Sequence, residues 1–384
     1  MPNQPLTYQL SYWERESFFR DIDFAVIGSG IVGLSAALRI RELAPGARVA
    51  VLERGPLPIG ASTRNAGFAC FGSVSELLDD MDRQGEDQVW PLVERRWLGL
   101  QRLRRRLGDG RLRYEGLGGF ELFRPEEQEL ASRCADAIPG FNRQARAITG
   151  LQETYRLANG RIPEFGLRGI SQLICNTGEG QLHTGEMARG LQEKALEAGI
   201  SIFNGLPVEA LEERPGGVEI RTAFGWSIPA GGAIIATNGF ARHLLPELSV
   251  RPARNQVLIT TPLPCCPLKG CFHYDRGYYY FRNIDNRILL GGGRHLDEAG
   301  ETTDEFGTTQ LIRNALLRLL KEVILPGQQI PIDSWWSGIM GVGQQKSPII
   351  RKVSPHVAAA VRLGGMGVAI GTLVGEEGAE MLLR

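Results

Sequence analysis

The chain has 384 residues, 43% of them hydrophobic and 22% charged, and its 43 basic side chains balance its 43 acidic ones. This length predicts two globular domains or one large interrupted domain, and the ordinary apolar and charged fractions exclude a disordered chain. No apolar run reaches the roughly 20 residues that a spanning helix needs, and zero net charge argues against nucleic-acid binding. We therefore expect a small-molecule partner.

The cysteines and the first 20 residues indicate the compartment. Six cysteines without a CxxC pair predict free thiols. Cys265, Cys266 and Cys271 lie close together, but no second ligand pair accompanies them, so we predict no metal site. Residues 1–20 carry charged and aromatic side chains where a signal peptide needs an apolar run, so we expect a cytoplasmic protein whose first 20 residues form an extension. The oligomeric state stays open.

Glycine is the residue type in excess, with 49 of 384 residues, about 13% against a usual roughly 7%. The first glycine cluster follows the apolar run 24–27 and precedes a helical pattern that begins at Leu34. A strand, a GxGxxG turn and a helix in this order predict a dinucleotide-binding unit. Its binding residues are Gly28, Ser29, Gly30, Ile31, Val32 and Gly33.

The following segments narrow the choice of dinucleotide. A second predicted strand, residues 48–52, ends in Glu53, which lies 20 residues after Gly33. An acidic side chain at this place accepts hydrogen bonds from the adenosine ribose and repels a 2′-phosphate, which disfavours NADP. Residues 60–73 are too rich in small polar residues for the next βαβ repeat of a plain dehydrogenase. Such a stretch suits the wrapping of a long cofactor, as FAD is.

Residues 60–67, Gly-Ala-Ser-Thr-Arg-Asn-Ala-Gly, resemble a segment of the D-amino-acid-oxidase-like (DAO) flavoprotein family. This family includes glycine oxidase, sarcosine oxidase and γ-glutamylputrescine oxidase, and the similarity to the last group is closest. Three further motifs agree: Ser-Tyr-Trp at 11–13, Gly-Gln-Leu-His at 180–183 and the glycine triplet 291–293. The resemblance extends from residue 11 to the C-terminus.

The resemblance implies an α/β fold, with a Rossmann-like FAD-binding domain of the GR2 type interleaved with an α+β substrate domain on a mixed or antiparallel sheet. We expect residues 21–80, 166–246 and 334–384 in the FAD domain, and 81–165 and 247–333 in the substrate domain. Local patterns predict helices at 88–107, 184–198 and 308–322, a hairpin at 218–228, a strand at 233–237 and a final helix after the glycines 364–371.

The resemblance also implies further cofactor-binding residues. They are Arg54, Ser62, Thr63, Arg64, Asn65, Ala66, Gly67, Phe68, Val208, Thr237, Asn238, Gly239, Gly338, Gly365, Met366, Gly367, Val368 and Ala369. Sarcosine oxidases attach FAD through a cysteine at the position of Gly338, so we expect non-covalent FAD here. The start of the final helix would present its positive end to the flavin.

The substrate candidates come from two other segments. If residues 278–282 form a strand, Tyr278, Tyr280 and Arg282 share one face, which is either the pocket side or a simple aromatic sheet face. Arg282 would then receive a carboxylate. Lys346 is one of the few lysines and would bind a carboxylate or assist reoxidation, unless it is an ordinary loop lysine. We take Met340, Lys346 and Tyr280 as the catalytic candidates.

The reaction implied by the resemblance is oxidation of a C–N bond in an amine or amino acid. Hydride passes to flavin N5, the imine hydrolyses, and oxygen or another acceptor reoxidises the flavin. The lysine that activates oxygen in sarcosine-oxidase relatives corresponds to Leu289, which leaves a dehydrogenase open. The alternatives are an FAD-dependent dehydrogenase of a 2-hydroxy acid or similar small alcohol, and a flavin-binding module without turnover.

Overall fold

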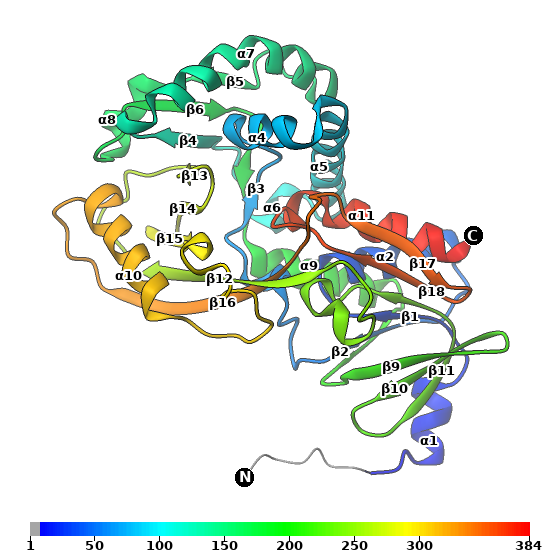
Figure 1. Ribbon diagram of the computed structural model, residues 1–384. Helices are drawn as coiled ribbons and strands as arrows, with labels where there is room; N and C mark the ends of the chain where they lie inside the picture. The colour runs from blue at the N-terminus through cyan, green and yellow to red at the C-terminus, as the bar shows by residue number, and fades with distance from the viewer. Residues whose placement is uncertain (1–7) are drawn as a thin grey trace. The chain divides into compact units, whose positions relative to one another are not determined.

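The structure, a computed structural model, describes residues 8–384 and divides the chain into two compact units. Unit 1 takes in the chain up to Thr63, Gly185–Ala253 and Met340–Arg384, and unit 2 comprises Arg64–Thr184 and Arg254–Ile339 (Figure 1). Residues 1–7 of the expected extension lie outside the described residues. The chain therefore passes between the units four times, which is an interleaved arrangement. Residues 64–80, 166–184 and 334–339, which we expected in the FAD domain, lie in unit 2. Residues 247–253, which we expected in the substrate domain, lie in unit 1.

Unit 1 is built on a sheet with the order β17-β18-β11-β1-β2-β8. The strands are β1 (Ile22–Ile27), β2 (Val49–Glu53), β8 (Ser201–Asn204), β11 (Ser227–Ile235), β17 (Ile349–Ser354) and β18 (Val357–Val361). All neighbours on this path are parallel except β17 and β18. β2 is buried at every position, as expected of a strand that is covered on both faces.

β9 (Val208–Arg214) and β10 (Gly217–Thr222) extend the same sheet beside β11. Residues 227–230 of β11 pair with β10, whereas residues 233–235 pair with β18. The predicted hairpin and the predicted strand 233–237 therefore share one continuous strand. The sequence suggested two because the glycines 231 and 232 interrupt its apolar pattern.

The helices and short turns of unit 1 are α1 (Tyr12–Glu14), a π turn (Arg15–Phe19), α2 (Ile31–Leu43), α9 (Thr184–Glu197), a 3-10 turn (Asn238–His243) and α11 (Gly367–Leu383). Of these, α2 and α11 pack closely on each other at a glycine. A Cβ atom at Gly375 of α11 would lie 2.3 Å from the carbonyl oxygen of Val32 in α2. A Cβ at Gly33 would lie 1.9 Å from the carbonyl oxygen of Gly28, so both positions require glycine for this packing.

Unit 2 contains a mixed sheet with the order β16-β12-β15-β14-β13-β4-β6-β5. The strands are β4 (Gly119–Phe123), β5 (Tyr155–Leu157), β6 (Gln172–Asn176), β12 (Arg251–Thr260), β13 (Cys271–Tyr274), β14 (Tyr279–Ile284), β15 (Arg287–Gly292) and β16 (Ile332–Val342). β13 and β4 are parallel, and the run from β12 through β15 and β14 to β13 is antiparallel. The short strands β3 (Phe68–Ala69) and β7 (Gly180–Gln181) form a separate pair.

Helices cover both faces of the unit 2 sheet. The helices of unit 2 are α4 (Val74–Gln84), α5 (Glu86–Leu107), α6 (Asp109–Leu112), α7 (Gln128–Thr149), α8 (Ile162–Phe165) and α10 (Gln310–Leu319), and a π turn (Leu320–Ile324) extends α10. The short helix α3 (Ala61–Arg64) spans the point where the chain leaves unit 1. Short 3-10 turns occupy Pro125–Glu127, Asn159–Arg161 and Arg294–Asp297. Phe123 packs with α4, α5 and α7 on one face, while Phe120 and Phe272 pack toward α10 on the other. Within residues 8–384 no helix is long and apolar enough to cross a membrane.

Candidate cofactor site

The carboxyl ends of the parallel strands in unit 1 bring the predicted cofactor residues to one edge. Ile27 of β1 lies opposite Leu52 of β2 and Ile235 of β11, and Ile235 in turn lies opposite Ala359 of β18. The segments that follow these strands therefore open at the same edge, the usual ligand site of an open parallel sheet. They contain the glycine turn 28–33, Glu53 with Arg54, residues 237–239 and the glycines before α11.

The first glycine turn presents the start of helix α2. The N-cap residue of α2 is Gly30, which has no side chain to cap the helix. The N–H of Ile31 in the first turn instead donates to Ser62 Oγ at 2.9 Å. A Cβ at Gly30 would lie 3.0 Å from the same oxygen. Ser62 belongs to residues 60–73, the segment expected to wrap the cofactor and called the wrap below, and it therefore packs directly on the glycine turn. The positive helix end and its amides suit the pyrophosphate of a dinucleotide.

Glu53 is oriented by the backbone around it. Its side chain is buried, with Oε2 accepting from Ser29 N at 3.0 Å and Ser29 Oγ at 2.9 Å, and Oε1 accepting from Gly55 N at 3.0 Å. A carboxylate offers about four acceptor sites, so one remains for a ribose hydroxyl. Leu206 N donates to the carbonyl of Glu53 at 2.8 Å, which brings the start of β9, with Val208, toward the same strand end.

Thr237 provides the test of whether this edge fits a dinucleotide. Its Oγ1 is buried and has no hydrogen-bond partner among the described residues. Its Cγ2 lies 3.7 Å from the Cβ position of Gly28, so the hydroxyl belongs to the surroundings of the glycine turn. A buried hydroxyl without a partner costs about 1–3 kcal/mol, and a phosphate or ribose oxygen is a suitable partner. The residues present therefore fit the cofactor.

The glycines 364–371, which we call the second glycine cluster, are held to the end of β11 and to β16. Asn238 Oδ1 accepts from the backbone N–H of Arg362 at 3.1 Å and of Leu363 at 3.3 Å. Gly364 N donates to the carbonyl of Gly341 at 3.0 Å. These bonds join three segments at the start of α11, which no N-cap side chain binds. The expected flavin end of the site thus lies at a free positive helix terminus.

Met340 and the backbone of Lys346 each lie beside this cluster. The sulfur of Met340 lies 3.5 Å from the Cβ position of Gly365, and the carbonyl oxygen of Lys346 lies 3.8 Å from that of Gly364. Lys346 belongs to the loop between β16 and β17. Arg362 holds this loop, because its Nε and Nη2 donate to the Ser347 carbonyl at 3.0 and 2.8 Å. No sequence pattern indicates this role for Arg362.

In unit 2 the wrap is fixed by Arg282. The side chain is 3% exposed, and its Nη1 donates to the carbonyls of Ala66, Gly67 and Leu182 at 3.1, 3.2 and 2.7 Å. Nε donates to the carbonyl of Asn283 at 3.1 Å, and burial lowers the pKa of Arg282. We expected Arg282 to receive a substrate carboxylate. The structure instead commits it to backbone carbonyls, which need donors where the wrap is buried.

The start of the wrap is held by β16. Arg64 Nη1 donates to the carbonyl of Ser337 at 3.0 Å, and Trp336 Nε1 donates to the carbonyl of Arg64 at 3.0 Å. A Cβ at Gly338 would lie 3.2 Å from Cβ of Arg64, so the predicted position Gly338 lies against the wrap. Asn65 Oδ1 accepts from Gly67 N at 2.7 Å and closes the turn. Sequence reasoning missed Trp336 and Ser337.

Of the three residues expected on one face of β14, the structure places two there. Tyr280 alternates with Tyr279 and shares the face of Arg282, with its ring centroid 5.7 Å from that of Phe68. Burial raises the pKa of Tyr280, so its hydroxyl keeps its proton. Tyr278 precedes the strand, because its N–H closes a turn on the Asp275 carbonyl at 3.0 Å. The expectation for Tyr278 was therefore wrong: its side chain is 47% exposed.

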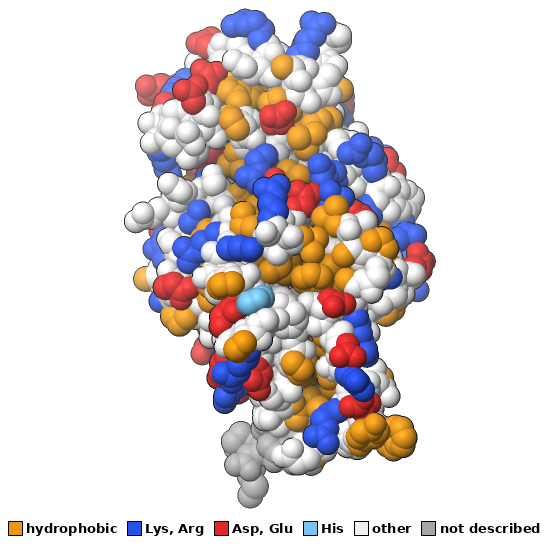
Figure 2. Space-filling view, turned by 90° about the vertical axis from the view of Figure 1, so that its right-hand side faces the viewer, with side chains coloured by type: hydrophobic (Ala, Val, Ile, Leu, Met, Phe, Trp, Pro, Cys, Tyr) orange, Lys and Arg blue, Asp and Glu red, His pale blue; other side chains and the backbone are white. Residues whose placement is uncertain are grey.

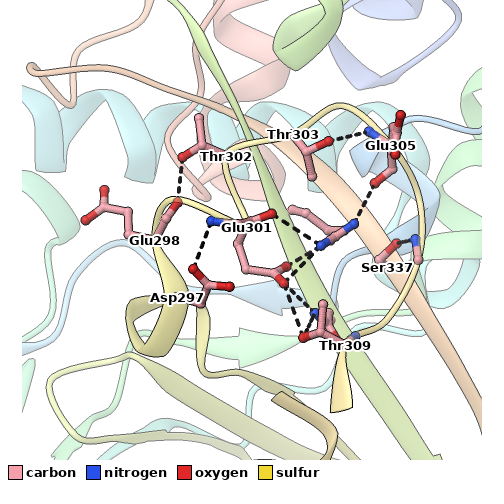
Figure 3. Close-up of polar contacts among 12 residues, drawn as sticks. Asp297, Glu298, Glu301, Thr302, Thr303, Glu305, Thr309 and Ser337 are labelled. Carbon is pink, nitrogen blue, oxygen red and sulfur yellow. Dashed lines mark hydrogen bonds and ion pairs between the residues drawn. The ribbon is translucent and has the colours of Figure 1, made fainter. Parts of the chain in front are cut away.

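A buried carboxylate that the sequence did not reveal fixes the loop before α10. Glu301 is fully buried and accepts from Arg254 Nε at 2.9 Å and from Gln256 Nε2 at 2.8 Å (Figure 3). Ser337 Oγ accepts from Gly307 N at 2.9 Å, which brings the loop to the residue that binds Arg64. Glu301 lies in a polar run that reads as an exposed loop, so no sequence signal distinguishes it.

The surface agrees with the balanced charge. On the face shown in Figure 2, basic and acidic side chains are interspersed with apolar ones. Two histidines near the sequence motifs are placed as follows. The ring centroid of His295 lies 4.3 Å from that of Tyr278, and the backbone N–H of His183 donates to the Leu112 carbonyl at 2.9 Å.

Comparison with known proteins gives one family. The model of the family described as FAD dependent oxidoreductase (DAO) matches residues 23–381. Oxidoreductase OrdL of Rhizobium meliloti is 28% identical over 95% of this chain and 83% of its own, and γ-glutamylputrescine oxidoreductase of Escherichia coli is 25% identical over 94% and 83%. The crystal structure of glycine oxidase from Geobacillus kaustophilus superposes with a TM-score of 0.74, at 20% identity and 94% coverage of both chains. The last similarity shows the fold.

Proposed function

This chain belongs to the FAD dependent oxidoreductase (DAO) family, and we propose that it oxidises a carbon–nitrogen bond of an amine or amino acid. The observation that carries the proposal is that Met340 and the backbone of Lys346 lie beside the second glycine cluster at the start of α11. Relatives named for γ-glutamylputrescine oxidation and for glycine oxidation support this substrate class. The fold itself would also serve other substrates.

FAD, when bound, supplies the two-electron acceptor. In our proposal the glycine turn, Glu53 and Thr237 hold the phosphates and the adenosine ribose. The free N-terminus of α11, with Gly365 and Gly367, holds the pyrimidine edge of the flavin without covalent attachment. Its positive end stabilises negative charge that develops beside it, and glycine lets backbone amides approach.

In our proposal each candidate side chain at the substrate end has a different task. Because Arg282 is committed to the wrap, we propose Lys346 as the group that attracts an anionic part of the substrate. Tyr280 is a hydrogen-bond donor and no general base, since burial raises the pKa of Tyr280. Hydride transfer from a neutral amine needs no strong base.

Anaerobic reduction of the purified flavoprotein tests the proposal. The panel contains amines, polyamine conjugates and amino acids, with 2-hydroxy acids as the rival class, and the readout is loss of the oxidised flavin absorbance near about 450 nm. We expect reduction by at least one nitrogen compound, with release of ammonia or an amine. Reduction by hydroxy acids alone, or by no compound of the panel, would contradict the proposal.

A further inference from the structure

Three metal-binding types of side chain meet inside unit 2, and none of the three has a role in the proposed oxidation. Cys70 follows β3, Glu179 precedes β7 and His273 belongs to β13. One ligand atom from each, a thiol sulfur, a carboxylate oxygen and a ring nitrogen, lies within 4.8 Å of the other two. These three positions are about 100 residues apart in the chain, so no local sequence pattern connects them.

Glu179 is oriented by two backbone amides. Its Oε1 accepts from Phe71 N at 2.9 Å and from Gly72 N at 3.1 Å. Its Oε2 lies 3.9 Å from His273 Nε2. A Cβ at Gly119 would lie 1.9 Å from this Oε2, so the neighbouring strand leaves space for the carboxylate only because it carries glycine there. The second oxygen is therefore aimed at the histidine with its acceptor sites available.

His273 and Cys70 complete the set. Nε2 of His273 is buried and has no hydrogen-bond partner among the described residues. The ring stands edge-on to Phe68, with centroids 5.3 Å apart, which restricts its rotation. Cys70 is 4% exposed. A buried ring nitrogen without a partner costs free energy, and a metal ion is one of the few partners that both nitrogen and sulfur share.

We propose that Cys70, Glu179 and His273 bind a divalent transition-metal ion, zinc in the first place. Zinc binds sulfur at about 2.3 Å and nitrogen or oxygen at about 2.0–2.2 Å, so its tetrahedral ligand atoms are roughly 3.3–3.6 Å apart. The oxygen and nitrogen at 3.9 Å need to approach by only about 0.5 Å. A thiolate, a carboxylate and a divalent cation sum to zero charge, which lowers the cost of burial.

A cavity beside Glu179 and His273 has room for a fourth ligand. It measures about 10 Å³, is lined by both Glu179 and His273, and also touches the polar residues Glu121, Tyr155 and Asn176. This volume is about the space that one water molecule occupies. Three protein ligands and a water are an ordinary zinc coordination set.

The competing occupant is a proton. An imidazolium at His273 would pair with Glu179, and Cys70 would remain a thiol. Zinc binding differs from this state because it deprotonates the cysteine and adds a sulfur ligand. The two states are therefore separated by measurements of the metal and of its sulfur neighbour.

The test uses the full-length flavoprotein dialysed against zinc and then against metal-free buffer. We expect about one zinc ion per chain by mass spectrometry and a zinc–sulfur distance near about 2.3 Å by X-ray absorption. In Cys70→Ser and His273→Gln the zinc affinity should fall at least about 100-fold. Cys134→Ser, which changes another buried cysteine of unit 2, is the matched control and should retain zinc.

Two further readouts keep the test decisive. A chelator should lower the melting temperature of the zinc-loaded wild type and leave that of Cys70→Ser unchanged, since bound metal stabilises only the native state. Flavin content should stay constant in all variants. The proposal is overturned if the wild type holds no stoichiometric zinc, if its spectrum lacks the sulfur neighbour, or if Cys70→Ser binds as the wild type does. If Cys70→Ser does not fold, the wild-type spectrum and His273→Gln decide.

Discussion

At Arg282 a single buried guanidinium organises the wrap. Its bonds to the carbonyls of Ala66, Gly67 and Leu182 replace water that burial removes. We expect Arg282→Met to lose about 2–4 kcal/mol of stabilisation in this segment and to raise the Kd for FAD about 10- to 100-fold. Titration of apoprotein with FAD measures the effect. Exposed Arg168→Met, in the same unit, should bind FAD normally, and equal affinity of both variants would refute the anchoring role.

Tyr280 makes a prediction about pH. Its pKa lies above that of an ordinary tyrosine because of burial, so the hydroxyl is protonated between about pH 6 and 10 in the folded protein. Tyr280→Phe should therefore lower kcat/KM by about 3- to 30-fold through loss of a donor, while the pH profile keeps its shape. Tyr279→Phe, on the opposite face of β14, should have the normal rate. A lost ionisation in the Tyr280→Phe profile would show that Tyr280 acts as a base.

Leu289 bears on the choice of electron acceptor. It is buried with Ala66 and Val257, and the wrap residue Phe68 and Tyr280 pack on the same cluster. Relatives of the sarcosine-oxidase group carry an oxygen-activating lysine at this position. Leu289→Lys should speed reoxidation of the reduced flavoprotein by oxygen at least about tenfold, since a positive charge favours electron transfer to oxygen. Stopped-flow absorbance measures this, and Leu289→Met is the control. An unchanged rate of reoxidation in Leu289→Lys would show that position 289 does not control reactivity with oxygen.

At the scale of elements, one arginine holds a loop to a strand. Arg362 follows β18 and binds the Ser347 carbonyl twice and the Ser249 carbonyl at 3.2 Å. Arg362→Met should free the loop 343–348, so its amides should exchange hydrogen at least about tenfold faster, and KM should rise more than kcat falls if Lys346 binds substrate. Arg351→Met, an exposed arginine on β17, should change neither. A normal exchange rate in Arg362→Met would show that Arg362 does not hold the loop 343–348.

Elements that carry a strong local pattern could be predicted from the sequence. The GxGxxG turn, the strand before it and the helix after it depend on neighbouring residues, and β1 and α2 appear where the pattern puts them. Residues whose role depends on distant partners could not be predicted. From the sequence, Arg282 resembles a substrate ligand, but in the structure it donates to carbonyls of the wrap. Glu301 resembles an exposed loop residue, but in the structure it accepts from Arg254.

At the scale of the molecule, chain order conceals the site. The strands β1, β2, β11 and β18 that share one edge are separated by up to about 330 residues, with unit 2 inserted between them in two segments. The resemblance to a known family predicted this interleaving, whereas length predicted only two globular domains or one large interrupted domain. The domain boundaries were harder to predict than the interleaving, because residues 64–80 continue the cofactor motif in sequence but pack in unit 2.

The assembled edge in unit 1 predicts which cofactor stabilises the folded protein. A ligand that binds only the native state adds RT ln(1 + [L]/Kd), about 2.7 kcal/mol at one hundred times its Kd. FAD should therefore raise the melting temperature of the apoprotein, whereas FMN, which lacks the adenosine that Glu53 would bind, should raise it much less. NADP should have little effect, because the Glu53 carboxylate repels a 2′-phosphate. In Glu53→Gln the shift with FAD should shrink toward that with FMN, while Glu42→Gln, at an exposed helix position, should behave as the wild type. Equal shifts with FMN and FAD would show that the glycine turn and Glu53 do not hold the adenosine half.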